Sequence, residues 1–150
     1  MHPNIISSDE ARVAELCRSA RRVAVLGIKT EAQRDQPGFY VPEALHRGGV
    51  EIVPVPVYYP EATTILGAPV YRRVADVPGA IDIVDVFRRS RDIAAHVDDI
   101  LAKMPRAVWL QSGIRDDEAA ERFAAAGILV VQERCLMVDW QHYAGSRPPR

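Results

Sequence analysis

The chain has 150 residues, 48% of them hydrophobic, with 19 lysines and arginines against 20 aspartates and glutamates. This composition is that of an ordinary globular protein, and it excludes a low-complexity or strongly charged chain. The balanced charge provides no basic surface for nucleic acid, and no apolar run approaches the ~20 residues of a membrane helix. We therefore expect neither nucleic-acid binding nor membrane insertion.

The two cysteines, Cys17 and Cys135, lie far apart and lack the ligand spacing of a zinc site. We expect two free thiols in a reducing compartment and no metal site. Residues 1–9 lack the basic region and apolar core of a signal peptide. The sequence thus predicts a soluble cytoplasmic protein.

The first third of the chain predicts a helix, a strand, a loop, a helix and a strand. Ser7 and Glu10 have the spacing of a capping box, which predicts a helix start. Residues 23–28 form a continuous apolar run, typical of a parallel strand covered on both faces. Residues 29–38 predict a loop and 39–47 a helix, in which Pro42 is tolerable only in the first turn. The second strand is expected at 51–57, paired at 52–55 because Pro56 leaves the sheet.

The rest of the chain repeats the alternation of strand and helix. Residues 61–78 are expected to be irregular, with single helical turns at 63–66 and 74–77. A strand is predicted at 81–87, and Ser90 opens a helix whose apolar stripe ends at Met104. Strands at 107–110 and 128–131 flank a helix that Asp116 caps and that runs through Ala126, and a short helix is expected after Cys135 through Tyr143.

This alternation predicts the α/β class: a doubly wound, mostly parallel five-stranded sheet with helices on both faces. We expect one domain over residues 1–150, with its core at about 8–140 and a frayed tail at 144–150. Ligands of such sheets bind outside the carboxyl ends of the strands.

The loop after the first strand is the first candidate for a phosphate site. It contains Gly27, Ile28, Lys29 and Thr30, and no second glycine follows until position 38, so the dinucleotide fingerprint is incomplete. Lys29 and Arg34 supply positive charge for a phosphate. The alternative is that Gly27 makes an ordinary turn and Lys29 is a solvated side chain.

Three further strand ends carry candidate ligand-binding residues. Pro56, Val57 and Tyr58 form an apolar and aromatic loop that suits stacking on a base, or is simply a proline-stiffened loop. At the end of the third strand, Val86 precedes Phe87 and Arg88, which could pack on an apolar ligand arm and bind phosphate respectively. Arg88 and Arg89 could equally be solvated or pair with Asp82 and Asp85. After the fourth strand, Gln111, Ser112 and Gly113 offer hydrogen-bonding groups.

No catalytic motif is evident, and none of these residues forms a nucleophile–base pair. The four histidines (His2, His46, His96 and His142) are expected to lie away from the crevice. Cys135 follows the fifth strand closely enough to reach the crevice, although such a cysteine is more often a small buried hydrophobe. NAD is disfavoured because the second strand ends without an acidic residue for the ribose.

Several stretches occur in the order seen in small single-domain CoA-binding proteins. They are VAVLG at 23–27, VPV at 53–55, ILG at 65–67, IDIVDVFRR at 81–89, AVWLQSG at 107–113 and RC at 134–135. Over about residues 8–140 the chain resembles the N-terminal CoA-binding domain of the succinyl-CoA synthetase alpha subunit.

The resemblance implies a Rossmann-like sheet with CoA as its ligand. The nucleotide and phosphates would meet residues 27–30, 56–58 and 86–88, and the pantetheine arm would run toward residues 111–113. The synthetase's catalytic histidine belongs to a separate domain, so the resemblance implies no ligase chemistry. The loop at 29–40 departs from the family pattern, since Thr30 stands for a serine hydroxyl and Lys29 adds a phosphate contact.

The leading hypothesis is a CoA or acyl-CoA binding module without catalytic machinery that acts as a carrier, sensor or regulator. The alternatives are an NAD(P)-dependent oxidoreductase and an acyl-CoA enzyme that uses Cys135. A third reading is an interaction domain that binds a protein partner through the apolar segment around Trp140.

Overall fold

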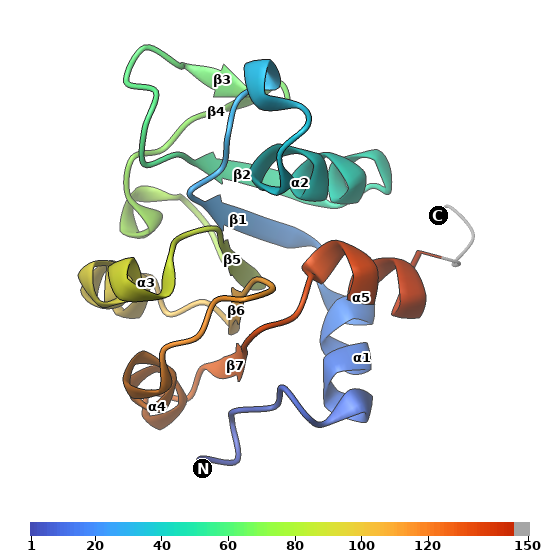
Figure 1. Cartoon of the computed structure of the whole chain (residues 1–150), viewed down its shortest axis with the longest axis vertical. Helices are drawn as coiled ribbons and strands as arrows, with labels where there is room; N and C mark the ends of the chain where they lie inside the picture. Colours follow the sequence, from blue (N-terminus) through green and yellow to red (C-terminus); the bar gives the residue numbers. More distant parts are fainter. Residues whose placement is uncertain (146–150) are drawn as a thin grey trace.

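A five-stranded parallel sheet lies at the centre of the computed structural model, which describes residues 1–145 (Figure 1). Its strands are β1 (Arg22–Leu26), β2 (Glu51–Val55), β5 (Ile83–Val86), β6 (Ala107–Leu110) and β7 (Leu129–Val131). The helices are α1 (Glu10–Ser19), α2 (Pro37–Arg47), α3 (Val97–Lys103), α4 (Asp117–Ala125) and α5 (Leu136–Tyr143). Short 3-10 helices are η1 (Glu31–Gln33), η2 (Val74–Asp76) and η3 (Ser90–His96), and β3 (Thr64–Ile65) pairs with β4 (Ala68–Pro69).

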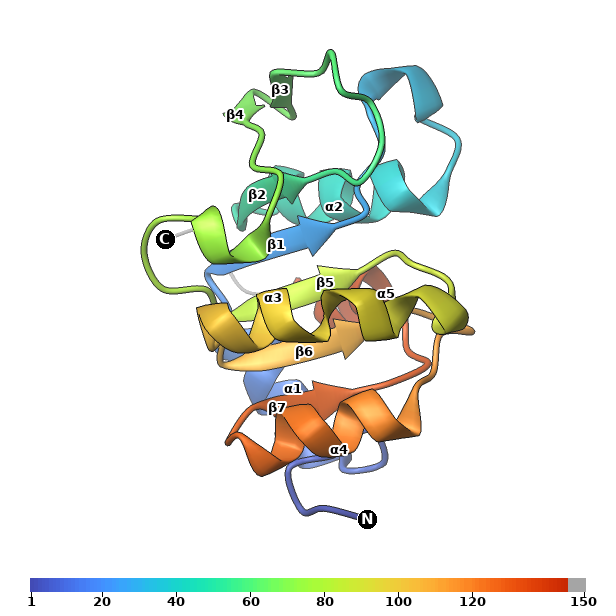
Figure 2. The ribbon, with the colours of Figure 1, turned by 90° about the vertical axis from the view of Figure 1, so that its left-hand side faces the viewer.

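Helices cover both faces of the sheet, as the sequence predicts. One face carries α3 and α4 (Figure 2), with Ile93, Ile100 and Phe123 packed against the sheet. The opposite face carries α1, α2 and α5, with Leu16 and Phe39 among its buried side chains. Because both faces are buried, the strands are continuous apolar runs rather than alternating ones.

The strand order β2-β1-β5-β6-β7 places β1 beside β5, although about sixty residues separate them in the chain. The chain crosses from β1 outward to β2 and then returns past β1 to β5. The strand order therefore reverses between β1 and β5, and this switch point is where open α/β sheets bind their ligands.

Two local predictions are wrong because a different contact forms, and the predicted helix from Ser90 is present but differs in detail. Asp9 rather than Ser7 caps α1, and the Ser7 hydroxyl instead accepts a hydrogen bond from the backbone N–H of Gln132. The predicted helical turn at 63–66 is the hairpin of β3 and β4, which buries Ile65. The apolar stripe after Ser90 begins as the 3-10 helix η3, and Met104 ends α3 in the left-handed conformation with its side chain exposed.

Pro42 lies inside α2, not in its first turn, because this helix begins at Pro37 rather than at 39. A proline cannot donate the hydrogen bond that the Gly38 carbonyl would receive in a regular helix. Here the backbone N–H of Lys29 donates to that carbonyl at 3.0 Å. The proline thereby frees an acceptor that ties the loop after β1 to the start of α2.

Arg134 joins α1, β6 and α5. Its guanidinium binds Asp139 at 2.7 Å and Glu10 at 2.7 Å, and its carbonyl accepts a hydrogen bond from the Trp109 ring at 2.7 Å. The hydrogen bond from Arg134 is the largest cause that lowers the pKa of Glu10 to about 2. In the middle of α5, Trp140 packs directly on Gly48, the residue that ends α2, and this contact holds α5 against the body of the protein.

Of the tail predicted to fray, Ala144 and Gly145 both donate hydrogen bonds to the carbonyl of Trp140, and residues 146–150 lie outside the described part. No helix among residues 1–145 is long and apolar enough to cross a membrane.

Candidate functional site

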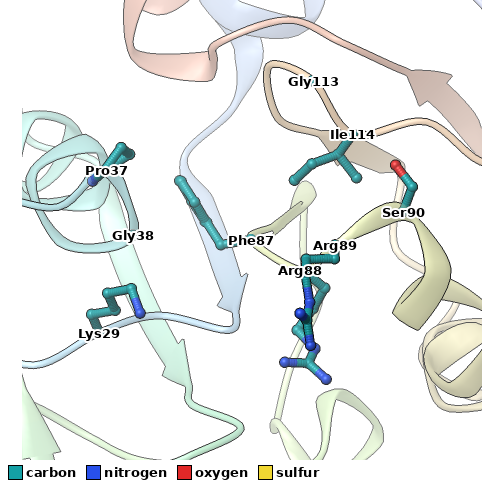
Figure 3. A pocket seen from close by; sticks show the side chains of 9 residues that line it. All are labelled: Lys29, Pro37, Gly38, Phe87, Arg88, Arg89, Ser90, Gly113 and Ile114. Atoms are coloured by element: carbon teal, nitrogen blue, oxygen red, sulfur yellow. The ribbon is translucent and has the colours of Figure 1, made fainter.

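A cavity of about 440 Å³ opens at the switch point between β1 and β5 (Figure 3). It lies between the start of α2, the end of β5 and the loop after β6. The residues that line it are Lys29, Pro37, Gly38, Phe87, Arg88, Arg89, Ser90, Gly113 and Ile114. The cavity is therefore built from segments that are distant in the chain and that the parallel sheet brings to one edge.

Gly27 allows β1 and β5 to approach each other closely at the base of this site. Its φ is +85°, and a Cβ built on it would overlap the carbonyl oxygen of Phe87 and lie 3.1 Å from the carbonyl carbon. The Arg88 side chain passes 3.3 Å from the same position. Only glycine combines this left-handed backbone with the missing side chain, so Gly27 is required for more than a turn.

The cavity is apolar on one side and cationic on the other. The side chains of Phe87 and Ile114 lie in the upper part of the view in Figure 3, whereas Lys29 lies below them on one side and Arg88 and Arg89 lie below them on the other. A ligand that carries both phosphates and a less polar arm matches this division.

Lys29 is held next to the N-terminus of α2. Its aliphatic stem packs on Gly38, where an added Cβ would lie 3.2 Å from the Cγ of Lys29. No acidic side chain among residues 1–145 forms an ion pair with its ammonium group, and no side chain caps α2. An unpaired cation beside an uncapped helix N-terminus favours an anionic ligand group.

Arg88 is fixed before any ligand binds. Its Nε donates to His96 Nε2 at 3.1 Å, its Nη1 lies 3.4 Å from the Tyr58 hydroxyl, and its guanidinium lies 5.6 Å from the centre of the Tyr58 ring. Asp92 adds a distant ion pair at 3.8 Å. The Arg88 side chain is 16% exposed, against 67% for Arg89, which pairs with the same Asp92. Arg88 is thus the preorganised cation of the site.

His96 corrects the expectation that every histidine lies away from the crevice. It accepts a hydrogen bond from Arg88 at Nε2, so this nitrogen carries no proton in this arrangement. Burial is the main cause that lowers the pKa of His96, and the Arg88 charge adds to it. The hydrogen bond from Arg88 likewise lowers the pKa of Tyr58.

Other predicted residues lie around the cavity rather than in its wall. Thr30 caps η1 through a capping box with Gln33. Arg34 is exposed at the end of η1, and its Nε–H donates a hydrogen bond to the Glu31 carbonyl. Ile28 and Val86 are buried in the two cores on either side of the sheet. Lys29, Phe87, Arg88 and Gly113 are the predicted residues that the cavity contains.

The strand ends of β2 and β6 flank the cavity. Pro56 is buried, Val57 packs against the core, and Tyr58 is 58% exposed and reaches the site through Arg88. Gln111 is buried and accepts a hydrogen bond from the Leu136 N–H, so its amide caps α5, while Ser112 is exposed beside Gly113. The Gln111 amide therefore holds α5, and the Ser112 hydroxyl faces solvent.

The sequence did not indicate Pro37, Gly38 and Ile114 as site residues, and it offered Arg89 and Ser90 only as a possible phosphate partner and a helix start. Pro37 and Gly38 were expected in a loop, although proline at the first helical position is itself a signal for a helix start. Their role becomes visible once α2 is seen to point its N-terminus into the cleft.

The two cysteines occupy different environments. Burial is the largest cause that raises the pKa of Cys17 to about 12, so this thiol stays protonated. Cys135 is half-buried at the N-cap of α5, and it packs against the core on the α1, α2 and α5 side of the sheet. It does not line the cavity.

Asp85 lies on β5, the central strand of the sheet, two residues before Phe87 of the cavity wall. It shares its face of β5 with Phe87 and stands between Val25 of β1 and Trp109 of β6. The residue is 1% exposed, and neither carboxylate oxygen has a hydrogen-bond partner among the described residues. Burial raises the pKa of Asp85 well above its usual value and favours the protonated form.

A family model described as a CoA binding domain matches residues 21–141. The chain belongs to this CoA-binding domain family. Protein YneT of Bacillus subtilis (strain 168) is 30% identical to this chain over 129 residues, which cover 86% of this chain and 92% of that protein.

Several solved structures share the fold of this chain. The Thermus thermophilus protein cell-free ID.343 has a TM-score of 0.81 and 33% identity, covering 90% of this chain and 98% of that one. A hypothetical protein from Pyrococcus horikoshii OT3 has a TM-score of 0.80 and 25% identity, covering 93% and 95%. The dinucleotide-forming acetyl-coenzyme A synthetase 1 of Ca. Korarchaeum cryptofilum aligns over 79% of this chain and 27% of its own length, with 18% identity and a TM-score of 0.64. At that identity the likeness concerns the fold alone.

Proposed function

We propose that this CoA-binding domain binds CoA or an acyl-CoA in the cleft between β1 and β5 and acts as a carrier, sensor or regulator without catalytic machinery of its own. The observation that carries the proposal is the division of the cavity into a cationic side with the prepositioned Arg88 and an apolar side between Phe87 and Ile114. CoA has the same division, with a phosphorylated nucleotide at one end and a pantetheine arm at the other.

The proposal places each part of the ligand next to a group of matching chemistry. The diphosphate lies against Lys29 and the N-terminus of α2, where an unpaired cation and free helix dipole favour negative charge. The adenosine end lies near Tyr58 and Arg88. The pantetheine arm passes between Phe87 and Ile114 toward Gly113, so the thiol leaves the cavity beside the loop after β6.

NAD binding is disfavoured by the end of β2. Glu51, the acidic residue of this strand, lies at its first position and pairs with Arg22 at the opposite edge of the sheet. A dinucleotide site needs an acidic side chain at the carboxyl end of this strand to hold the ribose.

Calorimetric titration with CoA, acetyl-CoA, NAD and NADP, at constant reductant concentration, tests the proposal. We expect CoA or acetyl-CoA to bind and both nicotinamide dinucleotides to give no heat above dilution. A ligand at 100 times its dissociation constant adds ~2.7 kcal/mol to the free energy of unfolding, so thermal melting checks the result independently. If the protein binds NAD but not CoA, the proposal is wrong. If it binds none of the four ligands, the proposal is wrong as well.

Replacement of Arg88 by alanine is expected to weaken CoA binding by about 1.5–3 kcal/mol, the scale of a hydrogen bond to a charged group. This corresponds to roughly a 10- to 150-fold rise in the dissociation constant. Arg91→Ala is the matched control because Arg91 is exposed on η3 and does not line the cavity. Equal binding by Arg88→Ala and the native protein would remove Arg88 from the site, and equal losses in both variants would indicate a general charge effect.

A further inference from the structure

The loop that leaves β2 carries Tyr58 toward Arg88 but has little regular structure of its own. Tyr59 has a φ of +63°, in the left-handed region that costs non-glycine residues free energy. The one backbone hydrogen bond within residues 58–62 joins the Ala62 N–H to the Tyr59 carbonyl. Something outside the loop must therefore hold this conformation.

Arg72 supplies that restraint. Its Nη1 lies 3.1 Å from the carbonyl oxygen of Tyr58, and its Nη2 lies 2.9 Å from that of Tyr59. The same Nη2 lies 3.3 Å and 3.0 Å from the carbonyl oxygens of Pro60 and Ala62. A single guanidinium thus binds four carbonyl groups of one turn. A lysine ammonium is a compact charge without the planar, forked arrangement of N–H donors, so it does not reproduce these contacts.

The base of the Arg72 side chain is itself anchored to the sheet. The backbone N–H of the preceding residue, Tyr71, donates to the Pro54 carbonyl of β2 at 3.0 Å, and the Tyr71 ring packs against the core. The restraint therefore runs from β2 through Arg72 to the loop. The loop in turn places the Tyr58 ring 5.6 Å from the Arg88 guanidinium.

We propose that Arg72 is a positioning residue that holds the 58–62 loop so that Tyr58 and Arg88 are preorganised for the nucleotide end of the ligand. The inference rests on the proposed CoA-binding function. Arg72 does not line the cavity, so it acts through Tyr58 rather than by touching the ligand. Without the Arg72 guanidinium, the ligand must order the loop and the side chains of Tyr58 and Arg88 when it binds, and this makes the binding free energy less favourable.

The test compares Arg72→Ala and Arg72→Lys with the native protein and with Arg73→Ala. Arg73 is the matched control because it neighbours Arg72, is 64% exposed and pairs with Asp99, away from the loop. The ligands are CoA and its two halves, adenosine 3′,5′-bisphosphate and 4′-phosphopantetheine, titrated by calorimetry. Circular dichroism melting verifies that every variant is folded.

We expect both Arg72 variants to weaken CoA and adenosine 3′,5′-bisphosphate about tenfold while 4′-phosphopantetheine stays within about twofold of the native value. Arg73→Ala should bind all three ligands as the native protein does. A merely structural role would lower the melting temperature and weaken both halves alike, which would overturn the proposal.

The remaining outcomes separate this inference from the function on which it rests. If the native protein binds CoA and Arg72→Ala binds it equally well, the positioning role is wrong and the proposed function stands. If Arg72→Lys binds normally, or Arg73→Ala is weakened as much as Arg72→Ala, charge and not the guanidinium fork is responsible, and the inference also fails. If the native protein binds neither CoA nor its halves, the proposed function fails and the inference falls with it.

Discussion

Replacement of Gly27 by alanine is expected to lower the free energy of unfolding by roughly 3–5 kcal/mol, among the largest effects of single substitutions. Two costs add up. The left-handed backbone at φ +85° is unfavourable for alanine by roughly 1–2 kcal/mol, and the new Cβ overlaps the Phe87 carbonyl oxygen. That carbonyl belongs to the backbone following β5 and cannot rotate away, so β1 and β5 must separate.

Gly127→Ala is the matched control for this substitution. Gly127 also has a positive φ, at +92°, but no atom lies within 4 Å of its Cβ position. We expect it to lose only the conformational part, roughly 1–2 kcal/mol. Urea unfolding followed by tryptophan fluorescence measures both values. If Gly27→Ala costs no more than Gly127→Ala, the close approach of the strands is not what requires glycine at this position.

The second large effect concerns the pH dependence of stability, which Asp85 should dominate in the neutral range. Its folded-state pKa is raised by burial, whereas an unfolded chain ionises it near the usual value of 3.8. The unfolded state therefore binds fewer protons than the folded state between these two pKa values. Stability is fully present below the lower value and is lost as pH rises, by up to about 1.4 kcal/mol per pH unit.

Asp85→Asn removes the ionisable group while keeping its shape. We expect the stability of this variant not to fall with rising pH in the way that Asp85 causes in the native protein. Its free energy of unfolding, measured by chemical unfolding, should therefore rise relative to that of the native protein between pH 5 and pH 8.5. The difference between the two proteins cancels the other titrating groups, including His96, whose lowered pKa costs stability below its unfolded-state value. Above pH 9 the raised pKa of Cys17 lowers the stability of both proteins as the unfolded chain loses this proton, so the measurements end before that range.

Asp98→Asn provides the control for this comparison, because the Asp98 side chain is 94% exposed in its ion pair with Arg122. It should keep the native pH profile, since an exposed ion pair contributes little to stability. If Asp85→Asn retains the full pH slope of the native protein, then Asp85 ionises in the folded state at an ordinary pH and its burial does not control stability.

Around the cleft, some residues lie where their local sequence predicts and others do not. The apolar runs of β1, β5 and β6 identified these strands, because residues that must be buried on both faces leave a strong local pattern. The same reasoning placed Lys29, Phe87, Arg88 and Gly113 at strand ends that meet in one cavity. It failed for His96, since a residue at the last position of η3, eight residues after Arg88, gives no local sign that it contacts the Arg88 side chain.

The local sequence also did not indicate the roles of Pro42 and Arg72, because both depend on contacts with residues farther away in the chain. Pro42 indicated a later helix boundary, and only the docking of Lys29 onto the Gly38 carbonyl explains how α2 accommodates it. Arg72 stood in a stretch that the sequence described as irregular, and its four carbonyl acceptors come from a loop ten to fourteen residues earlier.

The sequence by itself determined the α/β class, the identity of the five sheet strands and the strand ends from which ligand-binding residues come, because burial and backbone preference act over a few neighbouring residues. The tertiary structure decided which strand ends become neighbours, which cation is fixed and which polar groups are consumed within the fold. These outcomes depend on the reversal of strand order between β1 and β5 and on contacts between residues far apart in the chain, and no short-range pattern encodes them.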